Sequence, residues 1–128
     1  MGALLVLHVD DEADIREVTS LSLSLDPDIE VQSAASGQEA LEVLTAGLRP
    51  DVILLDVMMP MMDGPGTLRQ LREIPGCETT PVVFMTARTR NEERDAYRAL
   101  GAVAVVTKPF DPMSLAQQIR SIMAETRV

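Results

Sequence analysis

Short apolar segments of strand length alternate along the chain with longer amphipathic segments of helix length. The strands are expected at residues 3–9, 29–35, 51–57, 82–86 and 103–106. The first and third of these segments are almost continuously apolar, which is typical of parallel strands that are covered on both faces. This alternation of strand and helix predicts an α/β fold, a doubly wound parallel sheet of five strands with helices on both faces.

The intervening helices are predicted from apolar periodicity and from the residues that break it. In chain order they are expected to end near residue 25, to span 38–46, to end near 75–76, to span 91–100 and to include 115–123. In the helix at 91–100 we expect Ala96, Tyr97 and Leu100 to face inward. In the last helix, the apolar residues that recur with the helical period are Leu115, Ile119, Ile122 and Met123.

The composition is that of one folded domain. A length of 128 residues predicts a single domain over residues 1–128, and a hydrophobic content of 46% argues against intrinsic disorder. No apolar run approaches the ~20 residues of a membrane span, and the first residues lack the basic region and cleavage site of a signal peptide. We therefore expect a cytoplasmic location and no membrane association.

Charge and residue usage exclude several kinds of site. Acidic side chains outnumber basic ones by 20 to 11, which gives a formal net charge of −9 and disfavours direct nucleic-acid binding. The absence of Trp argues against a base-stacking surface. Cys77 is the only cysteine and His8 the only histidine, so an internal disulfide and a multi-histidine zinc centre are excluded.

Polar residues follow the predicted strands at the ends where ligands bind in open parallel sheets. They are Asp10, Asp11 and Glu12 after the first strand, Asp56 after the third, Thr86 after the fourth and Lys108 after the fifth. Taken singly, Asp11 could be a helix cap and Thr86 a strand former. Asp56 is harder to explain in this way, because a carboxylate that follows Val-Ile-Leu-Leu is costly to bury unless it is paired or binds a cation. The set as a whole indicates one polar site.

Several short motifs, in the same order along the chain, resemble the receiver domain of two-component response regulators. They are Val9-Asp10-Asp11-Glu12, Leu55-Asp56-Val57-Met58-Met59-Pro60, Met62-Asp63-Gly64, Thr86-Ala87 and Thr107-Lys108-Pro109-Phe110. The resemblance covers essentially the whole chain and is similar in form to single-domain regulators of the chemotaxis or relay type. It implies a flavodoxin-like fold with strand order 2-1-3-4-5, and a signalling protein rather than a turnover enzyme.

The resemblance also implies roles for individual residues. Asp56 corresponds to the phospho-acceptor, and Asp10 and Asp11 to the acidic pair that binds Mg²⁺ together with the backbone carbonyl of Met58. Carboxylate, carbonyl and water oxygens are the ligands that Mg²⁺ prefers. The donor would be a phosphohistidine on a histidine kinase or a histidine phosphotransfer protein.

Further roles concern the response to phosphorylation. Thr86 corresponds to the switch hydroxyl and Lys108 to the lysine that contacts the phosphoryl group, and the bond into Pro109 is usually cis in the family. Val105 stands where the family usually has an aromatic switch residue, which is a departure from the family pattern. We expect the face of residues 91–123 to bind a downstream protein or a second copy of the chain.

The segment at residues 103–106 is expected at the edge of the sheet. If its apolar side chains are exposed, they favour binding of a protein there; the alternative is that the flanking helices cover them.

Three alternatives to a phosphorylated receiver remain. A degenerate receiver would act as a phosphorylation-independent interaction module. A magnesium-dependent phosphatase typically has a second aspartate at the position of Met58, and a flavodoxin-type flavin carrier needs a Ser/Thr/Gly loop where this chain has acids.

Overall fold

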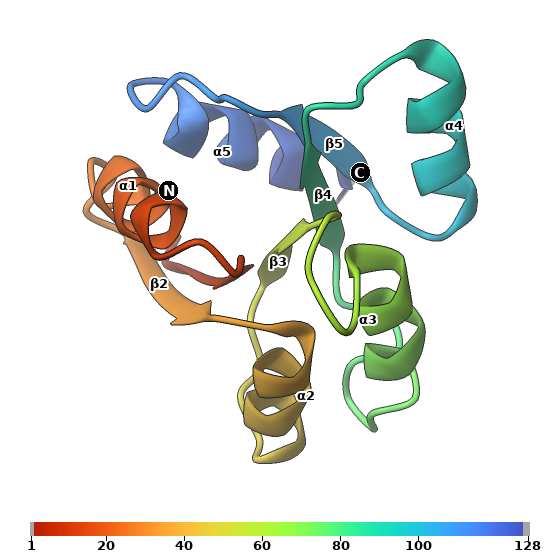
Figure 1. Ribbon diagram of the computed structural model, residues 1–128. Coiled ribbons are helices and arrows are strands. Elements are labelled where there is room, and N and C mark those ends of the chain that lie inside the picture. The colour runs from red at the N-terminus through yellow and green to blue at the C-terminus, as the bar shows by residue number, and fades with distance from the viewer. Residues whose placement is uncertain (1, 127–128) are drawn as a thin grey trace.

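The computed structural model describes residues 2–126, and the chain alternates strictly between strands and helices (Figure 1). The elements are β1 (Leu4–Val9), α1 (Ala13–Leu23), β2 (Ile29–Ala34), α2 (Gly37–Thr45), β3 (Val52–Asp56), α3 (Gly64–Leu71), β4 (Val82–Thr86), α4 (Asn91–Ala99), β5 (Ala104–Thr107) and α5 (Leu115–Thr126). None of the helices within residues 2–126 has the length and hydropathy needed to span a membrane.

The five strands form one parallel sheet in the order β2-β1-β3-β4-β5, which confirms the predicted fold class and strand order. The central strands β3 and β4 are buried along their whole length. Their near-continuous hydrophobicity reflects this position, because a parallel strand between two helical layers has no solvent-facing side.

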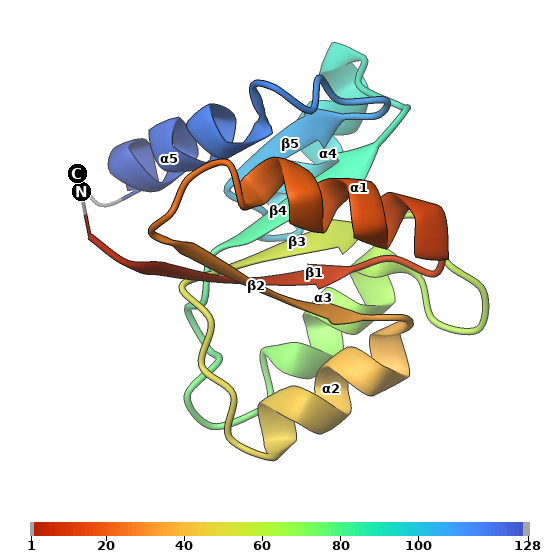
Figure 2. The same ribbon diagram turned by 90° about the vertical axis from the view of Figure 1, so that its left-hand side faces the viewer.

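Helices cover both faces of the sheet. In Figure 2, α1 and α5 lie above the sheet, while α2 and α3 lie below it. Each helical layer encloses its own cluster of buried apolar side chains. The first lies between the sheet and α1 and α5, and the second lies between the sheet and α2 and α3. Tyr97 of α4 packs on the second cluster, with its ring 5.3 Å from that of Phe84 in an edge-to-face arrangement. Apolar burial on both faces fixes the sheet and so fixes where its strands end.

One expectation about α4 is wrong, and the structure decides between the two alternatives for the β5 edge. Tyr97 is the inward-facing residue of α4, whereas Ala96 is exposed and Leu100 is 45% exposed. Leu100 lies at the C-cap of α4, where the helix ends, so helical periodicity does not set its direction. At the β5 edge, Val105 and Val106 are covered by the flanking helices, whereas Val103 and Ala104 remain partly exposed.

Candidate functional site

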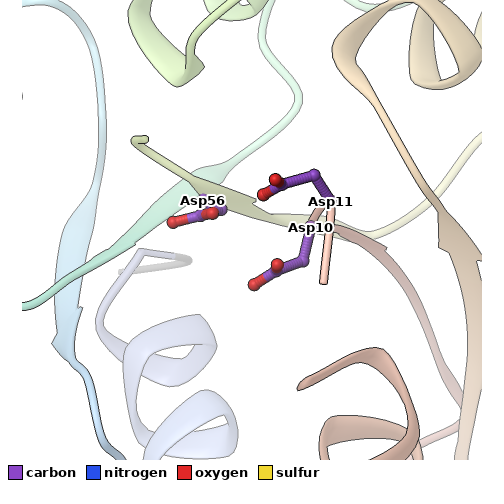
Figure 3. A group of neighbouring side chains, drawn as sticks. All are labelled: Asp10, Asp11 and Asp56. Carbon is purple, nitrogen blue, oxygen red and sulfur yellow. The ribbon is translucent and has the colours of Figure 1, made fainter. Parts of the chain in front are cut away.

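Three carboxylates meet at the carboxyl ends of two neighbouring strands. Asp10 and Asp11 directly follow β1, and Asp56 is the last residue of β3. β1 and β3 pair with Val9 opposite Leu55, so the next residues along the two strands, Asp10 and Asp56, lie side by side. One oxygen of each acid lies within 4.8 Å of an oxygen of the other two (Figure 3). The predicted acidic site is therefore assembled by the sheet itself.

Lys108 joins two of these acids from the end of the sheet's edge strand. Its Nζ donates to Asp10 Oδ2 at 3.1 Å and to Asp56 Oδ1 at 3.3 Å. Asp10 is fully buried and Asp56 is 4% exposed, whereas Asp11 faces solvent. The second oxygen of Asp10 accepts a hydrogen bond from the backbone N–H of Glu12 at 2.9 Å. The Lys108–Pro109 peptide bond that follows is cis.

The electrostatics of the site favour a bound cation. Burial raises the pKa of Asp56, and the charge of Asp10 raises it further, while Lys108 and a backbone hydrogen bond from Met58 only partly oppose this. Burial alone would lower the pKa of Lys108, but its hydrogen bonds and charge interactions with Asp10 and Asp56 raise it. One ammonium among three carboxylates leaves excess negative charge. A hard divalent cation such as Mg²⁺ fits this set of oxygen donors.

A small cavity of about 170 Å³ brings several of the predicted residues together. Its lining residues are Glu12, Asp56, Met58, Thr86, Ala87 and Lys108. Thr86 ends β4, is 3% exposed, and accepts a hydrogen bond through its Oγ1 from the backbone N–H of Arg88 at 3.1 Å. The Met58 side chain is 67% exposed, so its backbone rather than its thioether faces the acids.

Val105 lies away from the acidic site. It pairs in register with Phe84 and is 8% exposed. Its side chain lines a separate groove of about 390 Å³, formed with Ala104 and residues of α5 such as Ile122. The acidic site and the groove beside β5 therefore share no lining residue.

The loop after β3 depends on a close backbone approach at Gly64. Its N–H donates to Val57 O at 2.9 Å, and a Cβ at this position would lie 2.7 Å from Asp56 O. Asp63 then caps α3 by accepting from the N–H of Gly66 at 2.8 Å. The resemblance included Asp63 and Gly64 without assigning them a role, and their role here is to hold the backbone that carries Asp56.

Two further residues at the site were not predicted. His8 is fully buried on β1, and its Nε2 lies 3.9 Å from Asp10 Oδ2. Burial lowers its pKa to about 4, although the charge of Asp10 acts in the opposite direction. Arg16 of α1 donates through Nη1 to the backbone oxygen of Asp10 at 2.8 Å. A polar residue within an apolar strand was a usable signal for His8, whereas no sequence signal pointed to Arg16.

Residues 6–120 match the family model described as the response regulator receiver domain. The chain belongs to this receiver family. Receiver domains are signalling modules that accept a phosphoryl group, and they interact with histidine kinases or phosphotransfer proteins and with downstream effectors. A module that acts without phosphorylation is not favoured for this receiver domain.

Named relatives and a solved structure are similar to this receiver domain. A protein-glutamate methylesterase/protein-glutamine glutaminase of Cereibacter sphaeroides is 43% identical over 110 residues, which cover 84% of this chain and 29% of that protein. The response regulator Rre1 of Synechocystis is 38% identical over 119 residues, which cover 93% of this chain and 51% of that protein. The structure of the chemotaxis response regulator CheY4 of Vibrio cholerae matches with a TM-score of 0.85 and 35% identity, covering 94% of this chain and 98% of that one.

The receiver domain spans about half or less of the length of these two curated relatives. The esterase activity in the name of the Cereibacter protein is that protein's own. Receiver domains are typically signalling modules without turnover, and an acidic cluster suited to Mg²⁺ is present here.

Proposed function

We propose that this chain, acting in the cytoplasm as one domain over residues 1–128, accepts a phosphoryl group on Asp56 in a Mg²⁺-dependent reaction. The donor is a phosphohistidine of a histidine kinase or a histidine phosphotransfer protein. The observation that carries the proposal is the meeting of Asp10, Asp11, Asp56 and Lys108 at one end of the sheet. This site unites the predicted acceptor, the predicted metal-binding acids and the Lys108 ammonium.

The chemistry is an in-line displacement at phosphorus. A carboxylate oxygen of Asp56 forms a bond to phosphorus, the bond from phosphorus to the donor's imidazole nitrogen breaks, and the electron pair leaves with that nitrogen. Lys108 already contacts Asp56 Oδ1 and is placed to neutralise charge on a phosphoryl oxygen. Asp10, Asp11, Asp56 and the backbone carbonyl of Met58 would hold Mg²⁺, which supplies further charge neutralisation. The product is an acyl phosphate on Asp56.

Phosphorylation then acts on the β4–α4 loop. The phosphoryl group brings about −1.5 to −2 of charge into a site that is already acidic. The Thr86 hydroxyl, which now accepts from Arg88 N–H, can turn to donate to a phosphoryl oxygen and draw the loop with it. α4 follows readily, since none of its side chains is fully buried. Phosphorylation therefore shifts the population of α4 positions on the sheet.

The face formed by α4, β5 and α5, within residues 91–123, is where we propose that a downstream protein or a second copy binds. Its groove contains Ala104 and Ile122, which are partly exposed and apolar. Beryllofluoride, a phosphoryl analogue, added with Mg²⁺ should shift backbone amide NMR signals of α4 and β5 as well as those at the cavity. Shifts confined to the cavity-lining residues would contradict this coupling.

The test of the acceptor is labelling by a small phosphodonor. The wild-type chain incubated with acetyl phosphate and Mg²⁺ should gain the mass of one phosphoryl group, and a metal chelator should prevent the gain. Asp56→Asn should not be labelled, whereas the matched variant Asp28→Asn, at an exposed carboxylate outside the site, should be labelled like wild type. Equal labelling of wild type and Asp56→Asn would refute the assignment.

A further inference from the structure

His8 is a polar side chain in an apolar layer. It lies on β1 opposite Leu54, on the face of the sheet that packs against α1 and α5, and its side chain is fully buried. Among residues 2–126, neither Nδ1 nor Nε2 of the ring finds a hydrogen-bond partner. Unsatisfied buried polar groups are rare and destabilising, so each one calls for a physical reason.

The ring is aimed at the acidic site. Side chains two residues apart on a strand share a face, which puts His8 beneath Asp10. Nε2 lies 3.9 Å from Asp10 Oδ2, which is about 1 Å too long for a hydrogen bond. Oδ2 instead accepts from Lys108, and the same ammonium contacts Asp56. Asp10 Oδ2 therefore has Lys108 as its donor, and Asp10 shares this donor with Asp56, the predicted acceptor of the phosphoryl group.

We propose that His8 is a positioning residue that donates a hydrogen bond from Nε2–H to Asp10 when Lys108 turns to a phosphoryl group on Asp56. This inference rests on the proposed function. Asp10 is fully buried, so loss of the Lys108 contact would leave an anionic oxygen without its donor. A shift of about 1 Å brings Nε2 within range and keeps the Asp10 carboxylate oriented toward the cation. A neutral imidazole has one ring N–H to donate, and a protonated imidazole has two.

A purely space-filling role for His8 predicts different mutant effects from a role as a hydrogen-bond donor. If the ring only fills the core, a shorter side chain weakens folding and leaves phosphoryl binding unchanged. If His8 is a reserve donor, its nitrogens contribute nothing before phosphorylation. An apolar ring in its place then leaves the unphosphorylated protein as stable or makes it more stable, while binding of a phosphoryl group weakens.

The variants His8→Phe, His8→Gln and His8→Asn separate these roles. The Gln amide nitrogen reaches the position of Nε2, whereas the shorter Asn amide reaches only that of Nδ1. We expect His8→Phe to unfold at the same or a higher urea concentration without metal, yet to bind beryllofluoride about tenfold more weakly in calorimetry with Mg²⁺. His8→Gln should retain nearly wild-type binding and His8→Asn should not. Wild-type binding by both Phe and Asn variants would overturn the proposal.

Because His8 is the only histidine of the chain, its ring gives a single set of ¹⁵N and ¹H signals in protein made without a histidine tag. Mg²⁺ and beryllofluoride together should move the Nε2–H proton signal downfield, and Mg²⁺ alone should not. Unchanged ring signals in a protein that still accepts phosphate on Asp56 would refute this inference only. Failure of the wild-type chain to bind beryllofluoride or to be labelled by acetyl phosphate would instead refute the proposed function.

Discussion

Asp56 is buried beside Asp10, and its pKa is raised by that burial and by the charge of its neighbour. Carboxylate oxygens within 4.8 Å repel by about 3 kcal/mol at an effective dielectric constant of ~20. Asp56→Asn removes this repulsion but also the charge attraction to Lys108, whose Nζ lies 3.3 Å from Asp56 Oδ1. We therefore expect the variant to gain about 1–2 kcal/mol in free energy of unfolding, measured by urea denaturation in the presence of a metal chelator.

Magnesium should reverse that order of stability. A ligand that binds only the folded state stabilises it in proportion to the logarithm of its concentration over Kd, and the wild-type site offers one more carboxylate than the variant. Asp11→Asn is the matched control, because Asp11 is exposed and its removal should give a smaller gain without metal. A metal-free Asp56→Asn protein that is less stable than wild type would show that the Lys108 contact outweighs the repulsion.

At the level of single elements, the start of α3 is built around Gly64. In Gly64→Ala the new Cβ would lie 2.7 Å from Asp56 O and 2.9 Å from Val57 Cα, and neither backbone atom can move without displacing the end of β3. We expect a loss of about 1–3 kcal/mol in free energy of unfolding, together with weaker Mg²⁺ binding measured by calorimetry. The physical reason is that the same backbone carries the acceptor carboxylate.

Gly66→Ala, in the same helix, is the control for this change. Its nearest contacts are the side-chain atoms Asp63 Oδ1 at 3.1 Å and Met62 Cγ at 3.5 Å, which can adjust more easily than backbone. Alanine also favours the helix over glycine, so the free energy of unfolding should change little. If both variants lose stability equally while Mg²⁺ affinity is retained, the close approach at Gly64 does not control the site.

The order and approximate bounds of the helices and strands could be predicted, because the periodicity of apolar residues and the residues that end an element are features of the local sequence. The third strand was expected at 51–57 and is Val52–Asp56, and the first helix ends at Leu23 rather than near residue 25. The orientation of α4 was predicted wrongly, and the burial of β5 was left open. A short, highly charged helix with a single inward aromatic, Tyr97, carries too weak a pattern to orient it, and burial of Val105 depends on helices distant in sequence.

The composition of the acidic site could also be predicted, because the ends of parallel strands meet at one edge of the sheet. Asp10, Asp56 and Lys108 could be grouped from the sequence because they lie at the carboxyl ends of β1, β3 and β5. The bridging position of the Lys108 ammonium, the distance between His8 Nε2 and Asp10 Oδ2, and the approach of Arg16 to the Asp10 backbone depend on rotamers and packing. Those features follow from three-dimensional distances that no local pattern encodes.

At the scale of the whole molecule, the Arg120 side chain ties the first residues, the turn after α1 and the last helix together. Arg120 of α5 donates through Nε to Asp26 Oδ2 at 2.9 Å and through Nη1 to Gly2 O at 2.8 Å. The hydrogen bond from Arg120 lowers the pKa of Asp26 below its usual value, with a backbone hydrogen bond from Asp28 adding to the effect. This contact joins segments that are 94 residues apart.

The sign of the resulting pH dependence follows from linkage. A carboxyl group whose pKa is lower in the folded than in the unfolded state stabilises the fold above its unfolded pKa, and this stabilisation is lost as the pH falls through the folded value. The advantage of wild type over Asp26→Asn should therefore be full at neutral pH and disappear in strong acid, as measured by urea unfolding across that range. Arg120→Gln should show the same loss, and added salt should reduce it because the pair is partly exposed. Stability curves of wild type and Asp26→Asn that stay parallel from neutral pH into acid would mean that this pair does not hold the two ends of the fold together.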